Sequence, residues 1–215
     1  NPVRLITDFA NCCSVLWKDK LGQISLAITT LFWGAGATLQ FIVLKWAQES
    51  LNMPLDKSAN LQGVVAIGIA LGAVGAAKII PLRKSLSVMP MGVAMGLVVT
   101  TMIFIHNVTL AYPLLILVGV LAGFFVVPMN ALLQHRGHVL MSAGHSIAVQ
   151  NFNENLSVLT MLGLYALMIK LDLNVKTVIV MFGLFVACST YLVMRRHAAN
   201  QREFDSVALI GEHKH

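Results

Sequence analysis

Six long apolar segments dominate the sequence, and each is close to the roughly 20 residues that an α-helix needs to cross the hydrocarbon core of a bilayer. Short turns that hold most of the charged residues separate them. Since a helix satisfies all of its own backbone hydrogen bonds inside a membrane, the pattern predicts an all-α integral membrane protein with six transmembrane helices. The expected spans are 22–48, 61–80, 88–105, 110–133, 142–171 and 175–194.

The composition agrees with a membrane protein and argues against several soluble classes. Of the 215 residues, 57% are hydrophobic and 11% are charged, whereas soluble domains carry about 25% charged residues. A net charge of +6 would suggest nucleic-acid binding in a soluble chain, but here the basic residues lie in the turns. The sequence has no catalytic triad pattern, phosphate-binding loop or metal-ligand spacing. We therefore predict a protein that is not an enzyme and that uses no cofactor, metal or nucleic acid.

The distribution of Lys and Arg predicts the orientation of the chain. Eleven of the 15 lie on the side that holds both termini, and this excess places the termini in the cytoplasm. The eleven are Arg4, Lys18, Lys20, Lys78, Arg83, Lys84, Arg136, Arg195, Arg196, Arg202 and Lys214.

Shorter segments flank the six spans. Residues 1–20 have apolar positions at helical spacing and predict an amphipathic helix too short to span, which fits a linker between domains. Residues 21–197 form the transmembrane unit, and the polar residues 198–215 are expected to be a disordered cytoplasmic tail. The chain opens with Asn-Pro-Val-Arg where an initiator Met is expected, so we expect a fragment of a longer protein.

A polar stretch interrupts the fifth span. Residues 150–155 read Gln-Asn-Phe-Asn-Glu-Asn, and on a helix Gln150, Asn153 and Glu154 fall within one arc about 100° wide. Asn151 and Asn155 lie beside that arc. Burying such groups in hydrocarbon costs several kcal/mol unless a partner or water satisfies them. The stretch therefore indicates either a packed polar seam between helices or the wall of a transport pathway.

Other candidate residues lie on two further spans. Trp33 and Gln40 share a helical face in the first span, and Asn130 and Gln134 follow Pro128, a predicted bend, in the fourth. The last two are either a polar helix end near a loop or a cavity wall that faces Glu154. Three pairs of glycines four residues apart predict close helix packing. They are Gly68 and Gly72, Gly92 and Gly96, and Gly119 and Gly123.

Three runs of the sequence resemble the bacterial lysophospholipid transporters of the major facilitator superfamily. They are Leu-Phe-Trp-Gly-Ala-Gly-Ala-Thr-Leu at 31–39, Gly-Phe-Phe-Val-Val-Pro-Met-Asn-Ala-Leu-Leu-Gln at 123–134, and Ala-Val-Gln-Asn at 148–151 with Glu154 and Asn155. Two departures stand beside the likeness. Gln40 occupies a position that is often basic in those relatives, and the turn from Lys78 to Lys84 is a reduced form of a charged loop motif of the superfamily.

The resemblance implies the fold and function of a secondary transporter with two six-helix halves, of which this chain is the C-terminal one, helices seven to twelve. It implies movement of lysophosphatidylethanolamine and related lysophospholipids to the inner leaflet of the bacterial inner membrane, by alternating access, for reacylation by a partner acyltransferase. Glu154 would attract the ethanolamine ammonium or hold a basic residue of the missing N-terminal half. Head-group or pathway contacts would come from Gln150, Asn151, Asn153, Asn155, Gln40, Asn130, Gln134 and Trp33.

Two other functions fit the same residues. A major facilitator transporter of another substrate, such as a sugar, drug or ion, would share every feature of the pattern. In a membrane subunit that transports nothing, the polar face of the fifth span would instead be an assembly seam.

Overall fold

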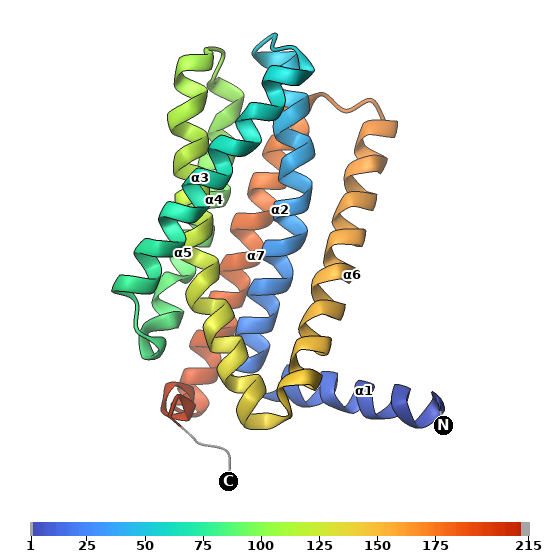
Figure 1. Cartoon of the computed structure of the whole chain (residues 1–215), viewed down its shortest axis with the longest axis vertical. Helices are drawn as coiled ribbons and strands as arrows, with labels where there is room; N and C mark the ends of the chain where they lie inside the picture. The colour runs from blue at the N-terminus through green and yellow to red at the C-terminus, as the bar shows by residue number, and fades with distance from the viewer. Residues whose placement is uncertain (1, 212–215) are drawn as a thin grey trace.

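The computed structural model describes residues 2–211, which are almost entirely helical and contain no strand within that range (Figure 1). The elements in chain order are α1 (Pro2–Lys18), α2 (Gly22–Ser50), α3 (Leu55–Ile79), η1 (Leu82–Val88), α4 (Met89–Thr100), η2 (Thr101–Phe104), α5 (Val108–Leu140), α6 (Ala143–Lys170), α7 (Val175–Glu203) and η3 (Ser206–Leu209).

Six segments of the described chain are long and apolar enough to cross a membrane, as the sequence predicted. Five are single helices, and the third joins η1, α4 and η2 over residues 82–104. The side chains of Asn107, Ser142 and Asn174 cap the N-termini of α5, α6 and α7, which fixes where these helices begin. The fold class is therefore an all-α membrane protein.

Several helices extend beyond the spans expected from hydropathy. α5 continues to Leu140, so His135, Arg136 and His138 lie in its final turns, and α7 continues to Glu203. Hydropathy marks only the part of a helix in hydrocarbon, whereas backbone hydrogen bonding continues into the polar interface. The expectation of a disordered tail is wrong for residues 198–211, because η3 packs on the bundle and buries Ser206 and Ile210. Residues 212–215 lie outside the described range.

α1 lies across one end of the bundle, next to the junction of α5 and α6 (Figure 1). The predicted amphipathic helix is confirmed. Leu16 is fully buried against α2, α5 and α6, and the Phe9 ring meets the Phe152 ring edge to face at 5.3 Å. Leu5 and Ile6, farther from the bundle, are about 70% exposed.

The glycine pairs bring two pairs of helices into backbone contact. A Cβ atom added at Gly72 of α3 would meet the backbone of Val120 and Phe124 in α5, and one at Gly123 would meet the backbone of Ile69 and Ala73 in α3. Gly96 of α4 lies against Gly183 and Ala187 of α7 in the same way. The close packing predicted from the glycine spacing is confirmed for α3 with α5 and for α4 with α7.

Two glycines of α3 differ in what surrounds them and give a test of this packing. Gly72→Ala is expected to lower the free energy of unfolding by about 1–3 kcal/mol, because the new methyl group meets backbone that cannot rotate away. Gly75→Ala is the matched control, since its Cβ would meet the Phe124 ring at an ordinary 3.7 Å. Thermal unfolding of the detergent-solubilised protein compares the two. Equal melting temperatures would contradict the assigned contact.

Candidate functional site

Three polar side chains from two helices form a hydrogen-bonded cluster within the membrane-spanning region. The Nε2 group of Gln150 donates to Oδ1 of Asn130 and to Oε1 of Glu154, both at 2.8 Å. Asn130 lies two residues after Pro128 in α5, whereas Gln150 and Glu154 are one turn apart on α6. All three side chains are partly buried.

The cluster leaves the carboxylate able to bind a further donor. Gln150 donates both of its side-chain amide hydrogens, one to Asn130 and one to Glu154. A carboxylate has about four lone-pair sites, and the bond from Gln150 uses one of them. An ammonium or guanidinium group is the strongest partner for the rest, because charge-assisted hydrogen bonds are roughly twice as strong as neutral ones. The arrangement thus suits recognition of a cationic group.

The remaining polar residues of α6 do not join this cluster. Asn153 faces α1, where its Oδ1 accepts a hydrogen bond from Trp17 Nε1 at 3.3 Å. Asn155 donates to the backbone carbonyl of Asn151 at 2.7 Å, and both residues are exposed. Within residues 2–211, the hydrogen bonds of the cluster join only Asn130, Gln150 and Glu154.

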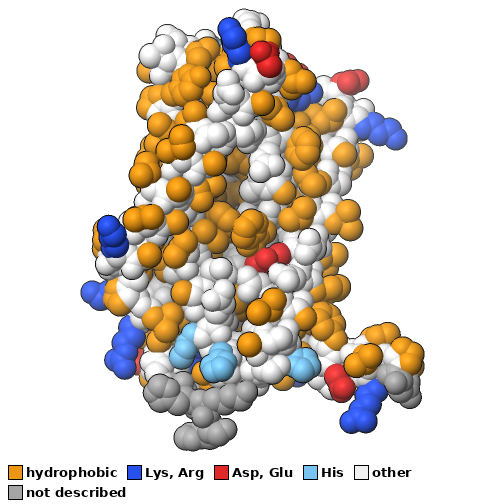
Figure 2. All heavy atoms as spheres, in the orientation of Figure 1, with side chains coloured by type: hydrophobic (Ala, Val, Ile, Leu, Met, Phe, Trp, Pro, Cys, Tyr) orange, Lys and Arg blue, Asp and Glu red, His pale blue; other side chains and the backbone are white. Residues whose placement is uncertain are grey.

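The other candidate residues lie near the cluster or in a separate pocket. Gln134 is exposed on α5, one turn from Asn130. Trp33 and Gln40 are exposed on α2 and line a cavity of about 330 Å³ between the helices. Figure 2 shows a hollow lined by hydrophobic side chains near the middle of the visible face. Sequence reasoning placed Trp33 and Gln40 on one face but found no pocket there.

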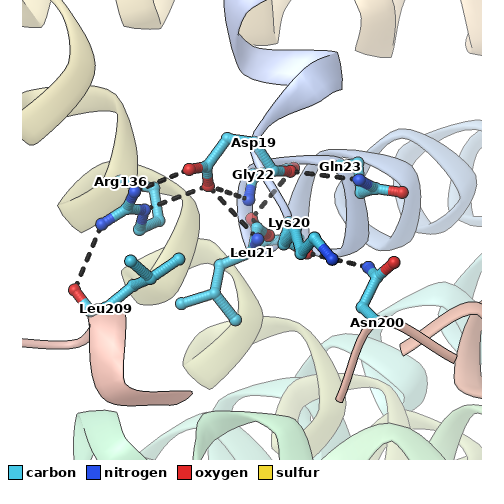
Figure 3. A network of polar contacts seen from close by, with 9 residues as sticks. Asp19, Lys20, Leu21, Gly22, Gln23, Arg136, Asn200 and Leu209 are labelled. Atoms are coloured by element: carbon cyan, nitrogen blue, oxygen red, sulfur yellow. Dashed lines mark hydrogen bonds and ion pairs between the residues drawn. The ribbon is translucent and has the colours of Figure 1, made fainter. Parts of the chain in front are cut away.

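A buried ion pair at the end of the bundle near α1 was missed by the sequence reasoning (Figure 3). Arg136 is 2% exposed, and its Nη2 and Nε groups bond the two carboxylate oxygens of Asp19 at 2.6 and 3.0 Å. Asp19 also accepts the backbone N–H of Gly22 at 2.7 Å, and Arg136 Nη1 donates to the Leu209 carbonyl at 3.1 Å. The pair ties the start of α2 to α5 and η3.

The described residues contain no group of three His, Cys, Asp or Glu side chains able to hold a metal ion. These residues instead offer hydrogen-bonding groups, the partly buried Glu154 carboxylate and an apolar cavity. Fold and cluster together define a polytopic α-helical membrane protein with a polar, hydrogen-bonded cluster among its spans.

Comparison with known proteins finds relatives over most of the chain. It is 44% identical over 176 residues to the lysophospholipid transporter LplT of Pectobacterium carotovorum, a match over 81% of this chain and 43% of that protein. For LplT of Photorhabdus laumondii the identity is 42% over 188 residues, or 87% and 47%. For LplT of Escherichia coli K12 it is 41% over 201 residues, or 92% and 51%.

The chain therefore spans about half the length of the curated relatives it matches. No family model matches the chain, and no solved structure matches it. The relatives are named as transporters, consistent with the sequence-based prediction that the chain is not an enzyme.

Proposed function

We propose that this chain is half of a secondary transporter that moves lysophospholipids, of the lysophosphatidylethanolamine type, across the bacterial inner membrane to its inner leaflet. The names of relatives at 41–44% identity support this substrate class. The observation that carries the proposal is the partly buried Glu154 carboxylate, held by Gln150 beside Asn130. It offers an anionic site to the ammonium of an ethanolamine head group.

A second six-helix half completes the proposed transporter. The chain matches about half of each relative's length, and α6, which carries Glu154, packs mainly on α2 and leaves most of its surface exposed. In the major facilitator arrangement this chain supplies helices seven to twelve, and residues 1–20 supply the linker from the first half. The exposed polar groups of α6, Asn151 and Asn155, then face the other half or the shared central cavity.

Transport in this proposal follows alternating access, with the two halves rocking about a site near the middle of the membrane. Glu154 binds the ammonium, and Asn130 and Gln150 position the carboxylate. Gln40, Gln134, Asn151, Asn153, Asn155 and Trp33 are assigned to the pathway walls. In this proposal both termini lie in the cytoplasm, where a partner acyltransferase receives the lysolipid for reacylation. The excess of Lys and Arg on one side supports this orientation.

A substrate panel on the intact protein tests this function. In proteoliposomes, the protein is expected to speed the flipping of fluorescent lysophosphatidylethanolamine well above empty liposomes, and to leave a sugar, a cationic drug and a diacyl phospholipid unmoved. Transport of the sugar or drug instead would identify a different carrier. Failure to move any compound, with the protein folded and correctly inserted, would favour a subunit that does not transport.

A further inference from the structure

The cavity between the helices opens to the outside, because Trp33, Gln40 and Ala66 among its lining residues are exposed. At about 330 Å³ it lies within the size range of small-molecule sites, roughly 300–1,000 Å³. Its walls are mostly aliphatic and aromatic side chains from α2, α3, α4, α5 and α7, including Phe32, Ile69, Met95, Val118 and Phe182. An apolar space of this kind favours an apolar occupant over water.

One polar side chain that lines the cavity, Gln62, is held by a hydrogen bond. Gln62 of α3 donates its side-chain Nε2 to the backbone carbonyl of Gln40 in α2 at 2.7 Å. This bond ties the two helices together at the end of the cavity where α2 approaches its last turns and α3 begins. The cavity is therefore bounded at one end by a hydrogen bond from the Gln62 side chain, and the rest of its lining is mostly apolar.

The opposite part of the cavity lies close to the proposed head-group site. Val158 of α6 lines the cavity and is one turn from Glu154, a rise of about 6 Å along the helix. Trp33 and Phe32, also lining residues, lie near the start of the cavity along α2. A carboxylate beside an apolar cavity is complementary to an amphiphile with a cationic head and a single hydrocarbon tail.

We infer that this cavity receives the acyl chain of the transported lysolipid, and that Gly36 sets the longest chain that fits. The inference rests on the proposed function and adds to it a second subsite and a basis for chain-length selection. Gly36 lines the cavity, and a Cβ atom added there would meet no atom within 4 Å. The side chain that glycine lacks would occupy the space of the ligand without displacing the protein.

Gly36→Leu tests the inference in the intact protein reconstituted into proteoliposomes. Flipping of stearoyl and of lauroyl lysophosphatidylethanolamine is measured side by side. A leucine in the cavity displaces several methylene groups of a long chain, so the stearoyl-to-lauroyl rate ratio is expected to fall about tenfold relative to the unsubstituted protein. Ala66→Leu, which fills the same cavity from α3, is expected to lower the ratio in the same direction, and it keeps the test decisive if Gly36→Leu does not fold.

Gly163→Leu is the matched control. Gly163 also has no atom within 4 Å of an added Cβ, but it lies on α6 outside the cavity, and its rate ratio is expected to stay unchanged. Unchanged ratios in folded Gly36→Leu or Ala66→Leu protein would overturn the acyl-chain site while leaving lysolipid transport intact. Absence of lysolipid flipping by the unsubstituted protein would instead refute the proposed function, and the acyl-chain site with it.

Discussion

Arg136→Ala is expected to lower the free energy of unfolding by about 3–5 kcal/mol, because it leaves the Asp19 carboxylate buried without its cationic partner. Asp19 has a side chain only 9% exposed and receives two hydrogen bonds from the guanidinium. The substitution also removes the bond to the Leu209 carbonyl. Thermal unfolding of the detergent-solubilised protein measures the loss, and limited proteolysis reports whether the C-terminal segment detaches.

Two further variants separate this ion pair from a general effect of charge. Arg195→Ala removes a cation from an exposed position on α7 and is expected to change stability by less than about 0.5 kcal/mol. Replacing both partners together, with Asp19→Leu and Arg136→Met, is expected to cost less than Arg136→Ala alone, because no charge remains buried. A single-site loss no greater than that of Arg195→Ala would show that the pair contributes little.

Glu154→Gln is expected to slow the flipping of lysophosphatidylethanolamine by about ten- to a hundredfold. The substitution keeps the size and the acceptor oxygen that Gln150 bonds, but it removes the charge that binds the ammonium, a charge-assisted hydrogen bond of roughly 1.5–3 kcal/mol. Lysophosphatidylglycerol, which has no ammonium group, is expected to be affected less. The measurement is the flipping rate of each lysolipid in proteoliposomes that contain the intact protein.

Glu49→Gln provides the control for this second prediction. Glu49 is an exposed carboxylate near the end of α2 that pairs with Lys45 at 3.3 Å, away from the cluster, so transport is expected to be unaffected. Because both variants lose one negative charge, a difference between them reports position and not net charge. Undiminished lysophosphatidylethanolamine flipping by Glu154→Gln would remove Glu154 from head-group recognition.

The sequence predicted the fold well because a membrane-spanning helix can be recognised from its length and its hydropathy. Length and hydropathy located all six spans, and glycine spacing identified the surfaces where helices touch. Glycine spacing did not show which helices pack together. Gly72 of α3 contacts α5 and Gly96 of α4 contacts α7, and in neither pair are the two helices consecutive in the sequence. Hydropathy also ended α5 too early, since the charged Arg136 looked like part of a loop.

The candidate site was predicted only in part. Helical periodicity placed Gln150 and Glu154 on one face, and the structure brings Asn130, which follows the Pro128 bend, into hydrogen-bond contact with Gln150. The same periodicity grouped Asn153 with them, but packing against α1 turns that side chain toward Trp17. The sequence did not predict the cavity, because apolar side chains from several helices form it. It did not predict the Asp19–Arg136 ion pair either, because the two residues are 117 positions apart in the sequence.

The pairing of α3 with α5 and of α4 with α7 has a consequence for biogenesis. In each pair the first helix, α3 or α4, leaves the ribosome before its partner, with at least one other span between the two. α3 and α4 must therefore enter the bilayer as independent hydrophobic segments and associate laterally afterwards, in keeping with the two-stage view of membrane protein assembly. Their glycine-lined surfaces would face lipid during that interval, and substitutions there would act on assembly before they act on the finished protein.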